Sequence, residues 1–313
     1  MTDDTTQPID IEQERRWIID HRTALNVGVR EIARLTGIPN GTLSQFMSEK
    51  GYGGREENVA EKVARYRQSL ANHASIEIEP RAMPEWYETG SSARLMELFQ
   101  FGRMGEIVVA AMVPGTGKTR SAKRFAWSHP NVFHATMTSS TAGVNTMQIE
   151  VLEAMGERDI KGTPQALSRR IRRRVEQYRN ALLIIDEAQH LSSKAIDEIR
   201  SWNDLSGVGI ALLGDTDLVQ KLAKFPQLFS RISLNIKQTQ ALETDLAPLA
   251  AAWGIEKPEI IAYLREIAMR PGALRRASKA LRLAYMMADA DGSPLDLAHL
   301  RDAAAQVSVQ AAA

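Results

Sequence analysis

A glycine-rich turn that joins a short apolar run to a helix-forming segment restricts what this chain can fold into. The apolar run spans residues 107–111, the turn reads PGTGKT and ends at Thr119, and the segment RSAKRFAW follows directly. Strand, glycine-rich turn and helix in this order form a phosphate-binding loop, because glycines let backbone N–H groups approach an anion and the helix N-terminus carries a positive dipole end. A chance glycine-rich turn is the alternative, and the flanking strand and helix argue against it.

The loop supplies side chains that suit a nucleotide with a metal ion. Lys118 is placed to reach the β- and γ-phosphates, and the Thr119 hydroxyl is placed to ligate Mg²⁺. The usual opening glycine, five residues before Gly117, is replaced by Met112, so the motif is a variant. The candidate nucleotide-binding residues of this loop are Pro114, Gly115, Thr116, Gly117, Lys118, Thr119 and Arg120.

A second motif ends in two neighbouring carboxylates. Residues 181–190 read ALLIIDEAQH, which predicts a buried strand with Asp186 at its carboxyl end, where ligands gather in α/β sheets. We expect Asp186 to hold Mg²⁺ and Glu187 to polarise the water that attacks the γ-phosphate of ATP. Taken alone, the pattern also suits a buried strand followed by a helix N-cap, but the phosphate-binding loop favours the catalytic interpretation.

Three polar positions further along the chain can complete such a site. Asp215 follows the apolar run 207–214 and either senses the γ-phosphate or belongs to the cap of the next helix, which Asp217 would begin. Arg231 precedes the last predicted strand, where an arginine can act as a finger into a neighbouring subunit's nucleotide. Arg275 lies at the start of a C-terminal helix and can fold down on the nucleotide.

The remaining pattern organises the chain into three regions. Short helices without β-branched runs fill residues 1–76, and two prolines mark a linker over residues 77–84. Residues 85–240 alternate apolar runs with helical stretches, which predicts an α/β core with a parallel sheet, and residues 241–313 are helical again. The predicted strands are residues 107–111, 132–136, 182–185, 208–213 and 232–236.

Composition excludes several classes of protein. The chain has 313 residues and no cysteine, which excludes a disulfide scaffold, cysteine-ligated zinc and thiol catalysis. Its 39 lysines and arginines nearly balance 38 acidic residues, so the net charge of +1 excludes a histone-like polycation. The apolar runs are far shorter than the roughly 20 residues that cross a bilayer, and the acidic, polar N-terminus is not a signal peptide. We expect a soluble intracellular protein without a membrane partner.

Together these motifs resemble those of an AAA+ ATPase. The segments MVPGTGKT, LLIIDEAQH, FSR and GALRR stand in family order between residues 83 and 307. The resemblance implies a five-stranded parallel sheet with a helical lid and ATP bound with Mg²⁺ between neighbouring subunits. It also implies Arg231 as the arginine finger and Arg275 as the sensor-2 residue. Met112 and the acidic tip at Asp215, where many relatives carry Asn, depart from the family pattern.

The combination of N-terminal helices with this ATPase resembles the bacteriophage Mu B transposition protein family. That resemblance implies ATP-dependent assembly of a homo-oligomer, in the form of a helical filament, on double-stranded DNA of largely any sequence. It further implies delivery of target DNA to a transposase in the cytoplasm of a bacterial host. The alternatives are an AAA+ loader or secretion-type ATPase with a protein-binding N-terminal domain, and a helix-turn-helix transcription regulator with ATP as a ligand. A helicase is a weaker alternative.

The N-terminal helices contain a candidate DNA-binding surface. Residues 29–47 read as a helix-turn-helix in which Gly37 permits the turn and Asn40 caps the second helix. The residues predicted to pack inward are Ile32, Ala33, Leu35, Leu43, Phe46 and Met47. The residues left for a DNA groove are Thr42, Ser44 and Gln45. A helical domain that binds protein is the alternative.

A second candidate surface is a predicted helix rich in arginine. From Lys161 to Arg179 the chain carries seven basic residues and one acidic residue. The predicted buried stripe is Leu167, Ile171, Val175 and Tyr178. The arginines expected to contact DNA phosphates are Arg169, Arg170, Arg172, Arg173 and Arg174. A basic interface with another subunit is the alternative, and residues 265–282, with six basic residues and one acid, are a weaker DNA-binding candidate.

Overall fold

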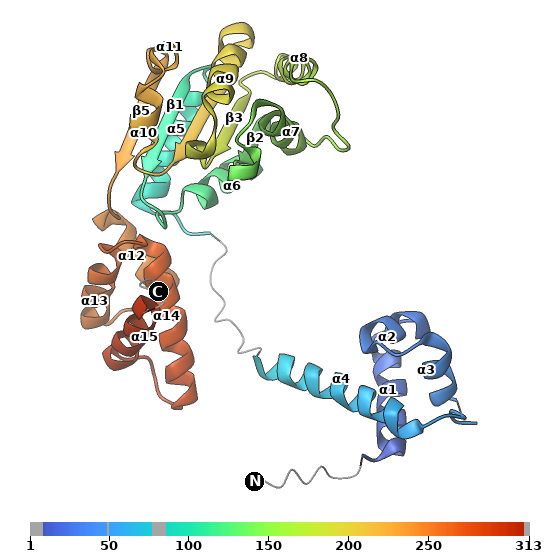
Figure 1. Cartoon of the computed structure of the whole chain (residues 1–313). Coiled ribbons are helices and arrows are strands. Elements are labelled where there is room, and N and C mark those ends of the chain that lie inside the picture. The colour runs from blue at the N-terminus through green and yellow to red at the C-terminus, as the bar shows by residue number, and fades with distance from the viewer. Residues whose placement is uncertain (1–8, 49, 77–85, 310–313) are drawn as a thin grey trace. The chain divides into compact units, whose positions relative to one another are not determined.

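The computed structural model describes residues 9–48, 50–76 and 86–309. The chain divides into two compact units between residues 82 and 83, and each unit is described by itself (Figure 1). The linker predicted over residues 77–84 lies outside the described residues. Among the described residues, no helix combines the length and the apolar character that crossing a membrane requires.

The N-terminal unit is a small bundle of helices around one apolar core. Asp10 caps the first helix, because its carboxylate accepts a hydrogen bond from the backbone N–H of Gln13 at 3.1 Å. Ile18, Ile32 and Phe46 are fully buried in the core that the four helices share. The helices are α1 (Ile11–Ala24), α2 (Val29–Thr36), α3 (Asn40–Phe46) and α4 (Glu56–Ile76).

The predicted helix-turn-helix is present, with two local corrections. Gly37 ends α2 in the left-handed conformation at φ 66°, which confirms its role in the turn. Leu35 was predicted to face inward but is 42% exposed, because Ile38, at 2%, fills the core beyond the end of α2. The predicted cap at Asn40 is wrong, since α3 begins at Asn40 itself and Pro39 occupies the cap position without a side-chain hydrogen bond.

The second unit is built on a five-stranded parallel sheet of strand order β2-β3-β4-β1-β5. This confirms the predicted fold class, and each predicted strand agrees with the observed one to within two residues. Strand β1 lies between β4 and the edge strand β5, so the loop after β1 emerges at the carboxyl end of the sheet beside the end of β4. The strands are β1 (Ile107–Met112), β2 (Val132–Thr136), β3 (Leu182–Asp186), β4 (Gly209–Gly214) and β5 (Ile232–Gln238).

Helices cover both faces of this sheet (Figure 1), as the continuous burial of β1, β3 and β4 requires. On one face, alternate strand residues such as Val108 and Ala110 pack against α5 (Gly90–Gly102) and α6 (Lys118–Ser128). On the other face, the intervening residues pack against the remaining helices of the core. Those helices are α7 (Val144–Ala154), α8 (Pro164–Val175), α9 (Ser193–Ser206), α10 (Leu218–Ala223) and α11 (Pro226–Phe229).

Four C-terminal helices form a lid with its own apolar core. Asp245, in the short turn η3 (Glu243–Asp245), joins the lid to the core, since its buried carboxylate accepts hydrogen bonds of 2.7 Å from both the backbone N–H and the hydroxyl of Ser91 at the start of α5. Leu249, Leu281 and Leu300 are fully buried in the lid core. The lid helices are α12 (Leu246–Ala252), α13 (Pro258–Ala268), α14 (Ala273–Ala290) and α15 (Leu297–Val309).

Candidate nucleotide-binding site

The glycine-rich loop leaves β1 and enters α6, as the sequence predicts. Gly115 and Gly117 adopt φ of 92° and 94°, a region that L-residues with side chains rarely occupy, so glycine is required at both positions. Lys118 is the first residue of α6, and its ammonium group donates hydrogen bonds to the carbonyl oxygens of Met112 at 2.6 Å and Val113 at 3.3 Å. Burial lowers the pKa of Lys118, while the Glu187, Asp186 and Asp215 carboxylates oppose that shift.

The unusual Met112 is accommodated because only its backbone faces the loop. Met112 is the last residue of β1, and its side chain is fully buried on the sheet face that α5 and α6 cover. Its carbonyl oxygen is the acceptor for Lys118. A methionine therefore replaces the usual glycine without entering the space beside the loop.

Thr119 and Asp186 meet at the carboxyl end of β3. The Thr119 hydroxyl donates a 2.6 Å hydrogen bond to Oδ2 of Asp186, and Nε2 of His134 on β2 lies 3.5 Å from the same oxygen. The Asp186 side chain is fully buried, which raises its pKa, but the hydrogen bonds from His134 and Thr119 outweigh burial and hold the pKa below its ordinary value. Asp186 is therefore held as a carboxylate next to a hydroxyl oxygen, two hard oxygen ligands side by side.

Glu187 directly follows β3 in a conformation that is unusual for a residue with a side chain. Its φ of 55° and ψ of 38° lie in the left-handed region, and such outliers gather at functional sites. Its backbone N–H donates to Oδ1 of Asp186 at 2.9 Å, and its side chain accepts a hydrogen bond from the Gln189 amide. The short turn η2 (Ala188–His190) begins directly afterwards.

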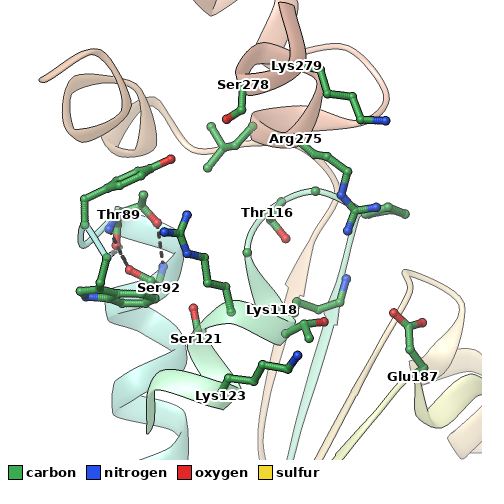
Figure 2. A pocket seen from close by; sticks show the side chains of 18 of the residues that line it. Thr89, Ser92, Thr116, Lys118, Ser121, Lys123, Glu187, Arg275, Ser278 and Lys279 are labelled. Carbon is green, nitrogen blue, oxygen red and sulfur yellow. Dashed lines mark hydrogen bonds between the residues drawn. The ribbon is translucent and has the colours of Figure 1, made fainter. Parts of the chain in front are cut away.

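Lys118, Thr119 and Glu187 line a cavity of about 570 Å³ between the core and the lid, whereas the fully buried Asp186 does not line it and contacts the lining residue Thr119. Figure 2 shows Lys118 and Glu187 on the core side and Arg275, Ser278 and Lys279 projecting from α14 on the lid side. The lid also contacts the loop directly, because the backbone N–H of Arg275 donates a hydrogen bond to the backbone carbonyl of Gly115 at 3.2 Å. The predicted residues that line the cavity are Pro114, Gly115, Thr116, Gly117, Lys118, Thr119, Arg120, Glu187, Asp215 and Arg275.

Asp215 faces the cavity rather than only capping the next helix. Its carboxylate accepts a hydrogen bond of 3.0 Å from the Asp217 N–H, and α10 starts after Asp217 without a side-chain cap. The tip of β4 therefore contributes a carboxylate to the site, as one of the two interpretations expects.

Several residues that line the cavity were not predicted. On the core side, Trp86 and Tyr87 precede α5, and the Arg120 guanidinium carbon lies 5.5 Å from the centre of the Tyr87 ring. Thr89, Ser92, Ser121 and Lys123 also line the core side, and Leu274, Ser278, Lys279 and Arg282 line the lid side. The lid residues could have been found from their spacing in the sequence. Polar side chains stand at i, i+3, i+4 and i+7, on one face of a helix: Arg275, Ser278, Lys279 and Arg282. Three of the six basic residues in the segment 265–282, the weaker DNA-binding candidate, thus line this cavity: Arg275, Lys279 and Arg282.

Arg231 lies apart from the cavity of its own chain. It stands between α11 and β5, at the amino end of a parallel strand, whereas the glycine-rich loop lies at the carboxyl ends. Its guanidinium Nε lies 2.7 Å from Oδ1 of Asp204 on α9, and the side chain is 49% exposed. Arg231 is therefore half-exposed at the surface, away from the cavity of its own chain.

The arginine-rich helix α8 buries the predicted stripe, with Leu167, Ile171 and Val175 at 3% exposure or less and Tyr178 packed beside them just after the helix. Its arginines divide into two groups. Arg170 and Arg174 form ion pairs with Glu157, and Arg174 also donates to the Met155 carbonyl at 3.1 Å. Arg169 and Arg173 are exposed and form no ion pair among the described residues, while Arg172 is half-buried. In the N-terminal unit, Ser44 and Gln45 are exposed and Thr42 is half-buried.

Comparison with known proteins places this site in a class. Residues 107–222 match the family described as AAA domain, so fold and sequence together define an AAA ATPase. Residues 230–307 match the family described as Mu B transposition protein, C terminal. Over 282 residues the chain is 32% identical to the ATP-dependent target DNA activator B of Escherichia phage Mu, and the match covers 88% of each chain. The chain therefore belongs to the Mu B transposition protein family, which confirms the resemblance seen in its sequence.

A further relative and two solved structures are also similar to this chain. The Mu-like prophage FluMu DNA transposition protein B of Haemophilus influenzae is 27% identical over 264 residues, which cover 82% of this chain and 90% of the relative. A chain from the structure of Drosophila ORC bound to DNA superposes with a TM-score of 0.51 at 17% identity, covering 71% of this chain and 62%, less than two thirds, of that chain. Cdc6p from Pyrobaculum aerophilum gives 0.54 at 12% identity, with 73% and 69% covered. At such identities the structural likeness concerns the fold alone.

Proposed function

We propose that this protein is an ATP-dependent activator of target DNA in Mu-like transposition, which assembles on duplex DNA and delivers it to a transposase. The observation that carries the proposal is the gathering of Lys118, Glu187, Asp215 and Arg275 around one cavity, in a chain of the Mu B family. The relatives in phages Mu and D108 are named ATP-dependent target DNA activator B, which supports the same activity.

The cavity fits ATP in size and in the chemistry of its walls. Its volume of about 570 Å³ lies within the range of about 300–1,000 Å³ found for cofactor sites. Backbone N–H groups of the loop and the Lys118 ammonium group supply the charge for phosphates, with Arg275 opposite them on the lid. Trp86 and Tyr87 offer aromatic surface for a base at another part of the wall.

The pair of Thr119 and Asp186 fits Mg²⁺. Magnesium prefers oxygen ligands and is usually held by one or two carboxylates together with substrate phosphates. The Thr119 hydroxyl and the Asp186 carboxylate are in hydrogen-bond contact, and they would bind the ion jointly with the phosphates of the nucleotide. When bound there, the ion neutralises phosphate charge that develops during hydrolysis.

The protein's own residues would divide the work of hydrolysis. Lys118 would turn from the carbonyls of Met112 and Val113 to the phosphates, which offer a stronger, charge-assisted hydrogen bond. Glu187 would accept a proton from the attacking water, while Arg275 would bring the lid onto the bound nucleotide. Arg231 would complete the site of a neighbouring subunit, which makes turnover depend on assembly.

We assign DNA contact chiefly to Arg169 and Arg173 of α8. They stand one helical turn apart and both are exposed, whereas the other two arginines beside them share an ion pair with Glu157. All four line a shallow cavity of about 470 Å³ at this surface. The expected contact is to DNA phosphates and is independent of base sequence. The groove residues of the N-terminal unit, Thr42, Ser44 and Gln45, would add a second contact.

The test is the binding of fluorescently labelled duplex DNA with ATP at several salt concentrations. Replacement of both Arg169 and Arg173 by alanine should lower affinity and reduce the slope of log K against log[salt] by roughly 1.8, since each phosphate contact contributes about 0.9. The double variant of Arg170 and Arg174 is the matched control and should leave most of the slope in place. An unchanged slope in the first variant would contradict the assignment of α8. Binding confined to one operator sequence would instead favour a transcription regulator.

A further inference from the structure

Gln189 makes a contact with Glu187 that the proposed mechanism does not yet use. Its Nε2 donates a hydrogen bond to Oε2 of Glu187, from two residues further along the chain. A carboxylate only accepts hydrogen bonds, so the amide nitrogen must face Glu187 and the amide oxygen must face away. Glu187 therefore has one oxygen held by the protein and one left to act as a base.

The amide oxygen of Gln189 is left without a hydrogen bond in this orientation of the side chain. Oε1 is buried and has no hydrogen-bond partner among the described residues, although buried polar atoms are normally paired. It lies against the end of β4, where a Cβ added at Gly214 would stand 2.6 Å away. The lack of a side chain at Gly214 thus leaves the space that the amide occupies while its nitrogen points to Glu187.

Lys221 of α10 anchors the turn that carries Gln189. Its ammonium group donates to the backbone carbonyl of Gln189 at 2.6 Å and also to that of Leu191. Burial lowers the pKa of Lys221, and the nearby Asp215 carboxylate opposes this shift. Gln189 is therefore held at two points. Its side chain bonds to Glu187, and its backbone carbonyl bonds to Lys221 of α10, the helix that follows Asp215 at the cavity wall.

We infer that Gln189 is a positioning residue for hydrolysis, which holds the Glu187 carboxylate in its working orientation without touching the nucleotide. The inference rests on the proposed role of Glu187 as the base. The unusual backbone conformation of Glu187 gives the contact its purpose, since a residue in the left-handed region needs its surroundings to hold it in place.

The test replaces the amide with a side chain of similar length that cannot donate. Gln189→Met should lower kcat for ATP by roughly 10- to 100-fold, because small misplacements of a catalytic group cost about that much. The KM for ATP and the Kd for a fluorescent, non-hydrolysable ATP analogue should stay unchanged, since Gln189 does not line the cavity. His190→Ala, at the exposed end of the same turn, is the matched control and should hydrolyse normally.

A double-mutant cycle separates positioning from a general structural role. In a Glu187→Gln background, Gln189→Met should cause no further loss of kcat, because both changes remove the same function. If Gln189→Met fails to fold, Lys221→Met tests the same turn through its backbone anchor and should give the same split between kcat and Kd. Unchanged or increased kcat, a parallel loss of analogue binding, or an additive loss in the double variant would each overturn the inference. Normal hydrolysis by Glu187→Gln alone would instead refute the proposed base.

Discussion

Nε of Arg231 lies 2.7 Å from Oδ1 of Asp204, and the other oxygen of that carboxylate accepts a 2.6 Å hydrogen bond from Arg200. Arg200 in turn pairs with Asp197, so a row of alternating charges runs along α9 to the start of β5. Asp204 thereby fixes the direction of a half-exposed arginine at the surface proposed to meet a neighbouring subunit.

Asp204→Asn should weaken catalysis between subunits more than it weakens the fold. The pair is partly exposed, and such ion pairs contribute only about 0–1 kcal/mol to stability, so the melting temperature should change little. ATPase activity measured in the presence of duplex DNA should fall by roughly tenfold through misplacement of Arg231. Asp197→Asn, which removes a partner of Arg200 but none of Arg231, is the control. Equal effects of the two variants on the ATPase would contradict this account.

Thr119→Ala should uncouple ATP binding from Mg²⁺. The hydroxyl is one of the two oxygen groups proposed to hold the ion, and its loss also removes a hydrogen bond from buried Asp186. Titrations of a fluorescent ATP analogue with and without Mg²⁺ should show metal-enhanced affinity in the native protein and little enhancement in the variant. A variant that keeps the full enhancement would show that Thr119 is not a ligand.

Gly115→Ala should prevent the lid from seating on the loop. A Cβ at this position would lie 2.0 Å from the backbone oxygen of Gly272, and the φ of 92° is itself unfavourable for alanine. We expect at least roughly tenfold weaker ATP binding, the loss that about 1.4 kcal/mol produces, in calorimetric titrations. Retention of native affinity would mean that closure of the lid on the loop is unnecessary.

Trp86 should report on the bound base. It lines the cavity, and an aromatic contact with a base is worth about 1–3 kcal/mol, so Trp86→Ala should weaken ATP binding by roughly 5- to 150-fold. Trp86→Phe should abolish any change in tryptophan emission on addition of ATP. Trp127→Phe, at a side chain that is 77% exposed and outside the cavity, should leave the change intact. If Trp86→Phe kept the change in emission and Trp127→Phe lost it, the base would lie away from Trp86.

The sequence alone was sufficient for the parts of this protein that local patterns determine. Buried parallel strands are continuous apolar runs, which made β1, β3 and β4 predictable, and the carboxyl ends of these strands located Lys118, Asp186 and Asp215. The helix-turn-helix was recognisable from Gly37, but whether Leu35 or Ile38 fills the core depends on where the first helix ends, which propensity does not fix within one residue.

Contacts between segments that are distant in the sequence could not be predicted from local patterns. The pairing of Glu157 with Arg170 and Arg174 depends on how α8 packs beside α7, and only that packing separates these arginines from Arg169 and Arg173. Trp86 belongs to the cavity because α5 brings the preceding residues to the loop. The sequence likewise did not indicate a role for Gln189, because that role depends on the hydrogen bond between its side chain and Glu187.

Electron microscopy of the protein with ATP and plain duplex DNA tests the central proposal most directly, because it examines nucleotide, DNA and assembly together. The account predicts regular protein filaments on DNA of any sequence with ATP, and none without nucleotide or with Lys118→Ala. Glu187→Gln should give filaments that persist, since it binds ATP without hydrolysing it. Identical DNA coverage with ATP, without nucleotide and with Lys118→Ala would contradict the proposal that ATP controls assembly.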